Sequence, residues 1–275
     1  MKRNRFRTCL CLSFFFLSLL PLKAQDNQVS GVNARQFHKY WKVESESPDY
    51  KVTFRGDTAE IVSPKGLTLW RKEKMSGKVT IEYDACVVSE TEKDRLSDLN
   101  CFWMVSDPKH PDNLWKREKW RNGIFLNCYS LQLYYMGYGG NHNSTTRFRR
   151  YDGNEAGITD PQARPAVLKE YTDAEHLLKA NHWYHIKITN ENNRVSYYID
   201  GKRLVDFRDA KPLTEGWFGF RTTLSRTRIT NFRYKCSLQE NPAVPLQWIG
   251  STPEMDKAVS FGVPFEKGKI SPEST

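Results

Sequence analysis

The sequence has few cysteines and no paired cysteine motif. Of six cysteines, only Cys86, Cys101, Cys128 and Cys236 lie outside the first 24 residues. None of these four belongs to a Cys-x-x-Cys pair, so a structural zinc site or a thioredoxin-type redox site is not expected. Their pairing stays open, because an oxidising compartment permits a disulfide and a buried free cysteine is equally ordinary in a strand. We expect none of them to be catalytic.

Long apolar runs are also scarce. One extends from Cys9 to Pro21, after a basic start that includes Lys2 and Arg3, and a small residue, Ala24, follows it before Gln25. This pattern predicts a signal peptide over residues 1–24. The run is too short to cross a bilayer stably, and no later segment approaches the roughly 20 apolar residues that a span needs. We therefore expect a secreted or periplasmic protein without a membrane span.

A strong excess of one charge is absent from the mature chain. The full sequence has 42 basic and 32 acidic residues and a net charge of +10. Removing the signal peptide leaves 37 basic residues against the same 32 acidic ones, a net charge of +5. No run of basic residues resembles a nucleic-acid-binding arm, so no nucleic-acid partner is expected. The mild positive charge is compatible with an acidic polysaccharide.

Amphipathic helical patterns are nearly absent, and short strand-like segments fill most of the chain. Asp200-Gly201, between Tyr197-Tyr-Ile199 and Arg203-Leu-Val205, is a strong signal for a two-residue hairpin turn. Regularly spaced short strands predict an all-β protein, an antiparallel two-sheet jelly-roll sandwich. The predicted strands cover residues 51–55, 59–63, 67–71, 78–88, 100–105, 123–136, 145–151, 182–189, 194–199, 202–208, 217–222 and 227–234.

Composition divides the mature chain into three parts. Residues 25–35 form a polar leader, residues 36–240 the jelly-roll domain, and residues 241–275 a proline- and glycine-containing linker with the possible start of a second domain. Within the domain, residues 89–99 and 152–178 interrupt the rhythm of strands. Inserts of this length are usually functional or mobile.

The stretch from Tyr134 to Tyr151 combines tyrosines, a glycine turn, amides and arginines. Alternation along a strand places Thr145, Arg147, Arg149 and Tyr151 on one face. Arginine forks suit carboxylates and aromatic rings offer stacking faces, so we predict a site for an acidic polysaccharide, pectic or glycosaminoglycan-like. The predicted ligand-binding residues are Tyr134, Asn141, Asn143, Arg147, Arg149 and Tyr151. The alternative is a solvated sheet edge whose charges discourage aggregation.

The same stretch also admits catalysis. A uronate lyase needs a group that neutralises the carboxylate and a base near the C5 proton. If the domain is a lyase, Tyr138 and His142 are the candidate catalytic residues. A glycosidase is disfavoured, because Glu82 and Asp84 share a strand face without a third carboxylate beside them.

Three tryptophans have different expected roles. Trp103 alternates with Cys101 and Val105, which favours core packing. Trp115 and Trp120 lie in a basic, loop-like stretch, where an exposed ring costs solvation unless it meets a ligand or a partner. For these two, packing and ligand contact remain equal alternatives.

Four segments resemble the C-terminal half of concanavalin A-like lectin and glucanase jelly rolls. They are residues 181–189, 195–202, 216–221 and 229–233, and they are also similar to secreted bacterial 3-keto-disaccharide hydrolase domains. The residues 100–104 and 145–151 resemble an uncharacterised branch of this superfamily found in polysaccharide-degrading bacteria. The resemblance implies the fold but not the activity, so cleavage of a keto-sugar glycoside stays an alternative. It implies no cofactor or metal, apart from a possible structural calcium that no dense Asp/Asn loop announces.

A second resemblance lies near the C-terminus. Pro245-Leu-Gln-Trp-Ile249 and the segment Val259–Gly268 resemble the opening of the N-terminal domain of exo-acting rhamnogalacturonan lyases. This implies a carbohydrate-recognition module that leads a larger polysaccharide-degrading enzyme, with the lyase domain downstream and missing from this chain. We expect such a module to bind without cleaving.

Overall fold

The structure is a computed structural model that describes residues 29–30, 34–56, 58–92 and 94–237. Its longer elements, in chain order, are β1 (Val29–Ser30), α1 (Ala34–Tyr40), β2 (Trp41–Ser45), β3 (Lys51–Arg55), β4 (Thr58–Arg71), β5 (Met75–Ser76), β6 (Lys78–Val88), β7 (Leu99–Ser106), α2 (Glu118–Arg121), β8 (Gln132–Gly139), α3 (Gly140–Asn143), β9 (Thr145–Asp152), β10 (Lys169–Tyr171), β11 (Trp183–Glu191), β12 (Arg194–Ile199), β13 (Lys202–Arg208) and β14 (Glu215–Ser237). Short 3₁₀ helices occupy Leu114–Arg117, Leu126–Ser130, Glu155–Ile158, Pro161–Ala163 and Ala174–His176. The predicted signal peptide and the lyase-like segments 245–249 and 259–268 lie outside the described residues.

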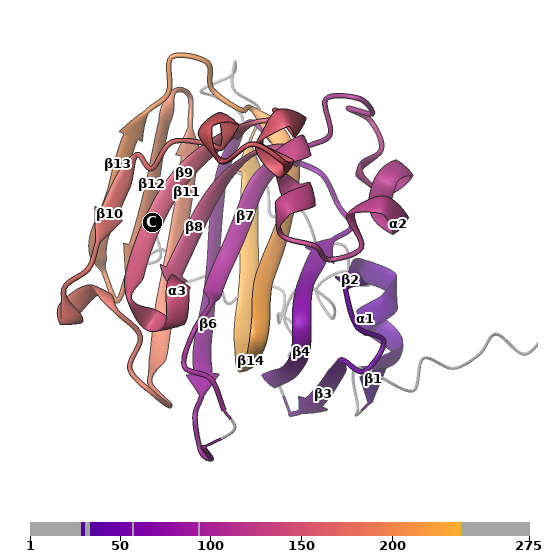
Figure 1. The fold of residues 1–275 in the computed structure, drawn as a ribbon, viewed down its shortest axis with the longest axis vertical. Helices are drawn as coiled ribbons and strands as arrows, with labels where there is room; N and C mark the ends of the chain where they lie inside the picture. Colours follow the sequence, from indigo (N-terminus) through magenta and orange to yellow (C-terminus); the bar gives the residue numbers. More distant parts are fainter. Residues whose placement is uncertain (1–28, 31–33, 57, 93, 238–275) are drawn as a thin grey trace, which may run out of the picture.

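Two sheets pack face to face, and two long strands take part in both (Figure 1). The first sheet runs β10-β9-β8-β7-β14-β4-β2, and the second runs β13-β12-β11-β6-β14-β4-β3-β1. The first half of β14 pairs with β7 and its second half with β6. Apart from the two-residue pairing of β1 with β3, the ladders described here are antiparallel. The predicted all-β, antiparallel jelly-roll sandwich is therefore confirmed.

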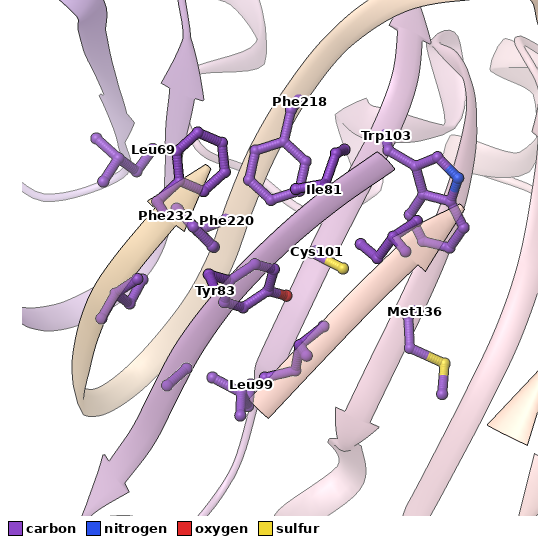
Figure 2. Close-up of a cluster of buried hydrophobic side chains, with 14 of the residues drawn as sticks. Leu69, Ile81, Tyr83, Leu99, Cys101, Trp103, Met136, Phe218, Phe220 and Phe232 are labelled. Atoms are coloured by element: carbon purple, nitrogen blue, oxygen red, sulfur yellow. The ribbon is translucent and has the colours of Figure 1, made fainter. Parts of the chain in front are cut away.

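Aromatic side chains dominate the core between the sheets (Figure 2). Trp103 on β7 is fully buried, and its ring lies 5.7 Å from that of Tyr134 and 6.0 Å from that of Phe148, in its own sheet. From the opposite sheet, the Tyr197 ring stacks on it at 6.2 Å. The prediction that Trp103 packs in the core is confirmed.

Four of the predicted strands are observed with the predicted bounds. Strands β3, β6, β12 and β13 begin and end at the predicted residues. The predicted segments 59–63 and 67–71 join into β4, because Pro64 lies where the ladder to β14 shifts register and no strand N–H is needed. The prediction of a strand over 123–136 is wrong at its start: a 3₁₀ helix occupies Leu126–Ser130 before β8. Strands β2 and β10 and helix α1 were not predicted.

The four described cysteines are free and buried. Burial raises the pKa of the Cys101 and Cys128 thiols to about 12. Thiols in this state are not nucleophilic near neutral pH. In the part of the chain that the structure describes, no helix is long and apolar enough to cross a membrane.

Replacing Trp103 tests the core. Trp103→Ala should lower the free energy of unfolding by about 3 to 5 kcal/mol, because it removes a fully buried ring and leaves a cavity between the sheets. Urea denaturation measures the loss. Trp120→Ala is the control: this ring is 42% exposed, and its removal should cost less than about 1 kcal/mol. Equal losses in the two variants would contradict the assignment.

Candidate functional site

The candidate site lies on the face of the first sheet that points away from the core. Arg147 on β9 is in register with Gly137 on β8, Gly137 with Asn100 on β7, and Asn100 with Arg221 on β14. These four residues form one row across four strands. Because neighbouring strands lie about 4.8 Å apart, the two arginine backbones stand about 14 Å from each other, with a low floor between them.

A pocket of about 530 Å³ opens over this row, within the usual size range of small-ligand sites. We call it the arginine pocket, because guanidinium groups dominate its charge. One part of its wall is apolar and aromatic, and consists of Phe125, Leu126, Tyr129 and Tyr135. The charged and titratable side chains are Arg95, Arg147, Arg149, Arg164, Arg221 and His142, against two carboxylates, Glu46 and Asp98.

Several of these arginines have acidic partners. Arg95 pairs with Asp98 at 2.9 Å, Arg147 with Glu170 at 2.6 Å, and Arg221 lies 3.9 Å from Glu46.

Arg149 and Arg164 differ from the others. Arg149 donates to the carbonyl of Pro165 and Arg164 to that of Gly157, each at 3.2 Å. Within the described part of the chain, no carboxylate approaches either guanidinium to 4.0 Å. Their positive charge is therefore not neutralised by an acidic side chain there, although both line the pocket.

Tyr135 brings a phenol into the same space. A Cβ atom added to Gly137 would lie 2.3 Å from the Tyr135 hydroxyl oxygen, so glycine is required for the phenol to extend over the floor. Burial raises the pKa of Tyr135 above its usual value of 10.0, against the opposing charges of Arg149 and Arg221. The phenol is therefore neutral at physiological pH and able to donate a hydrogen bond. No described side chain accepts one from it.

Except for Tyr135 on β8, the apolar wall belongs to the segment between β7 and β8, which a buried ion pair fixes to the sheet. Figure 1 shows α2 of this segment near β2. The fully buried Arg121 donates to Glu44 through Nη2 at 2.9 Å and Nε at 3.3 Å. Glu44 also accepts from the Gly123 amide at 3.4 Å, and the Gly123 carbonyl accepts from Arg221. The ion pair thus positions both the apolar wall and one arginine of the floor.

Losing Arg121 should therefore destabilise the protein. Arg121→Ala leaves the Glu44 carboxylate buried without its cation, and we expect a loss of about 3 to 5 kcal/mol in the free energy of unfolding. Arg194→Ala breaks an exposed pair with Asp206 and should cost less than about 1 kcal/mol. Chemical denaturation of both variants is the measurement. A small effect at Arg121 would show that the wall is held by its apolar contacts alone.

The structure brings together part of the predicted site. Asn141, His142, Arg147 and Arg149 line the arginine pocket. The predicted shared face of Arg147, Arg149 and Tyr151 is confirmed, but Tyr151 is fully buried beneath the wall, 5.3 Å from the Tyr129 ring.

Asn143 is predicted as a ligand contact, but its side chain instead binds the backbone of Leu178. Its side chain accepts from the Leu178 amide at 2.8 Å and donates to the Leu178 carbonyl at 2.9 Å. Asn141, His142 and Asn143 all have positive φ angles, between 51° and 58°. Three successive left-handed residues are strained, and such strain is commonest at functional sites. The bonds to Leu178 hold this turn at the edge of the pocket.

The prediction that Tyr134 and Tyr138 face the ligand is wrong. Tyr134 is fully buried between the sheets and donates to Asp209 at 2.6 Å, and Tyr138 is 3% exposed and donates to the Leu177 carbonyl at 3.3 Å. The physical reason is which alternate residues of β8 face the pocket. Tyr135 is the residue opposite Arg149, so the odd-numbered residues of β8 face the pocket, and a shift of one position exchanges the two faces.

Sequence reasoning missed most of the residues that line the pocket. Four of them come from regions far apart in sequence: Arg95, Tyr129, Arg164 and Arg221. Another, Tyr135, lies on β8, where the prediction chose the opposite face of the strand. The glycine at 137 was the available signal, since a floor residue without a side chain marks the strand face that a ligand approaches. Among the described residues, no group of three or more His, Cys, Asp or Glu side chains is placed to hold a metal ion.

The fold is that of galectin-like jelly rolls. A protein of unknown function from Bacillus subtilis, described as having a galectin-like fold, superposes with a TM-score of 0.57 over 74% of this chain and 91% of its own, at 15% identity. A carbohydrate-binding module of the same organism, CBM66, aligns with 70% of this chain and 94% of its own, at 14% identity and a TM-score of 0.47.

A family model identifies the particular group. The model described as a domain of unknown function (DUF6250) matches residues 61–232, and the chain belongs to that family. The matched segment includes the arginine pocket except for Glu46. It ends before residue 245, so it gives no support to the resemblance to rhamnogalacturonan lyases. The search of curated proteins gives no match.

Proposed function

We propose that the arginine pocket binds an acidic saccharide, and that the protein is a carbohydrate-recognition module. The observation that carries the proposal is the pair Arg149 and Arg164, which line a pocket of ligand size without an acidic partner among the described residues. Guanidinium forks bind carboxylates in a planar, bidentate manner. A carboxylate held there would also lie within the reach of a neutral phenol donor, Tyr135.

The apolar wall supports a sugar rather than a simple anion. Phe125 and Tyr129 lie 5.9 Å apart, and Phe125 and Tyr135 5.7 Å apart, so the rings form a connected surface beside the arginines. A sugar acid presents a carboxylate and an apolar C–H face to such a wall. Asn100 and Asn141 add amide groups for hydroxyls. The ligand class that we propose is an acidic polysaccharide, pectic or glycosaminoglycan-like, met outside the cell, as the predicted signal peptide implies.

Two substitutions test the charge. Arg149→Ala and Arg164→Ala should each weaken binding to polygalacturonate or chondroitin sulfate by about ten- to a hundredfold, because each removes a charged hydrogen-bond donor worth about 1.5 to 3 kcal/mol. Isothermal calorimetry at fixed salt measures the change. The matched control is Arg208→Ala, an exposed arginine at the end of β13 in the other sheet, which should bind like the wild type.

The alternatives give different results in the same assay. Unchanged affinity in both pocket variants would place the site elsewhere. Equal binding of neutral glucans and acidic polymers would show that the aromatic wall, and not the charge, carries recognition.

Two neighbouring tyrosines test which alternate residues of β8 face the pocket. Tyr135→Phe should weaken binding by about tenfold and leave stability unchanged, because no described group in the protein accepts from its hydroxyl. Tyr134→Phe should bind normally but lose about 1 to 3 kcal/mol of stability, since it leaves Asp209 and the Leu213 amide without the phenol. The raised pKa keeps Tyr135 protonated, so its contribution to binding should be constant between about pH 7 and pH 9. The reverse assignment of the two effects would show the strand phase to be incorrect.

A second candidate function is a uronate lyase. It is favoured by the presence of His142, Arg149 and Tyr135 in one pocket, which offers a base, a neutralising cation and an acid. Tyr138, the other predicted catalytic residue, is buried in the core and does not reach this pocket. Absorbance of the unsaturated product separates the two functions: steady formation that is lost in His142→Ala would establish the lyase.

A further inference from the structure

Beyond the arginine pocket, the segment that forms its apolar wall continues as an exposed apolar strip. Trp120 is 42% exposed, Ile124 36% and Leu126 37%, and all three lie within seven residues. Leu126 belongs to both, because it also lines the pocket. The Asn127 side-chain amide donates to the Trp120 carbonyl at 3.0 Å, which holds the turn of Trp120 beside the residues of the pocket wall. We call Trp120, Ile124 and Leu126 the tryptophan strip.

The exposed indole is held in place. The guanidinium carbon of Arg117 lies 4.1 Å from the centre of the Trp120 ring. Arg117 is itself fixed by ion pairs with Glu155 at 2.6 Å and with the fully buried Asp107 at 3.4 Å. A ring that is already ordered loses little side-chain entropy when a ligand covers it. Its exposure in the free protein costs solvation that a ligand would recover.

We infer that the tryptophan strip is a second saccharide subsite, on which further sugar residues of the ligand in the arginine pocket stack. This rests on the proposed function and extends it: the ligand is an oligosaccharide longer than the pocket, and not a single sugar acid. Leu126 lines the pocket, and the next residue, Asn127, donates to the Trp120 carbonyl, so a ligand that extends from the pocket over Leu126 would approach Trp120. The exposed neighbours Lys116 and Lys119 suit a ligand that carries carboxylates along its length.

The occupant follows from the character of the strip. The strip consists of three exposed apolar side chains with lysines nearby in the chain, so it lacks the wide apolar centre of a stable protein interface. An aromatic ring beside basic groups instead matches the alternating apolar faces and carboxylates of an acidic oligosaccharide.

Calorimetry with two size series, oligogalacturonates and chondroitin sulfate oligosaccharides from the shortest unit to the hexamer, tests the inference. In the wild type, affinity should increase with length beyond the unit that fills the pocket. Trp120→Ala should bind the shortest ligand like the wild type and the hexamer about tenfold more weakly, so that the increase with length disappears. Trp120→Phe keeps a stacking ring and should retain most of the increase.

Trp183→Ala is the matched control, because Trp183 is also 42% exposed but lies on β11 of the second sheet. It should reproduce the wild-type dependence on length. Wild-type affinity that does not depend on length, or a Trp120→Ala protein that binds the hexamer like the wild type, would overturn the second subsite while leaving the proposed function intact. If no length of either series binds, the proposed function fails, and the second subsite fails with it.

Discussion

The first sheet buries side chains on both of its faces, and the rest of the molecule follows from this constraint. On one face, Trp103 and Tyr134 pack against the second sheet. On the other, Phe102 and Tyr135 pack beneath the segment between β7 and β8. Because apolar groups cover part of the outer face, the uncovered remainder becomes a hollow with an aromatic wall and a polar floor. The pocket is thus a consequence of where the second layer of packing ends.

The segment that makes this second layer depends on a charge pair for its position. Glu44 and Arg121 are both buried, and their bonds reach Trp70 and Gly123 as well. A buried ion pair seldom adds net stability, but removing one partner is costly, because the other charge is then left buried without compensation. Here it sets the distance between the aromatic wall and the row from Arg147 to Arg221. It also ties the tryptophan strip to the pocket, because Arg121 lies next to Trp120 in the same short helix.

The arginines of the pocket differ in whether an acidic side chain neutralises their charge. Arg147 and Arg95 have acidic partners within 3 Å, so their charge is neutralised by ion pairs within the protein. Arg149 and Arg164 are held by backbone carbonyls, which orient a guanidinium without neutralising it. Orientation without neutralisation is what a preorganised anion site requires.

Local patterns in the sequence determined most of the strands, the hairpin at Asp200-Gly201, the core role of Trp103 and the face shared by Arg147 and Arg149, because strand alternation and turn chemistry act within a few residues. Apart from the signal of Gly137, tertiary structure decided which face of β8 turns to the arginine pocket. Tyr134 and Tyr135 are equally aromatic, and the strand carries apolar groups on both faces. The alternation of polar and apolar residues along β8 therefore does not distinguish the core face from the outer face. The register that places Tyr135 opposite Arg149 decides which face of β8 lines the pocket, and this register depends on the whole sheet. The same holds for Arg164, Arg221 and Tyr129, which reach the pocket from distant segments that only folding brings together.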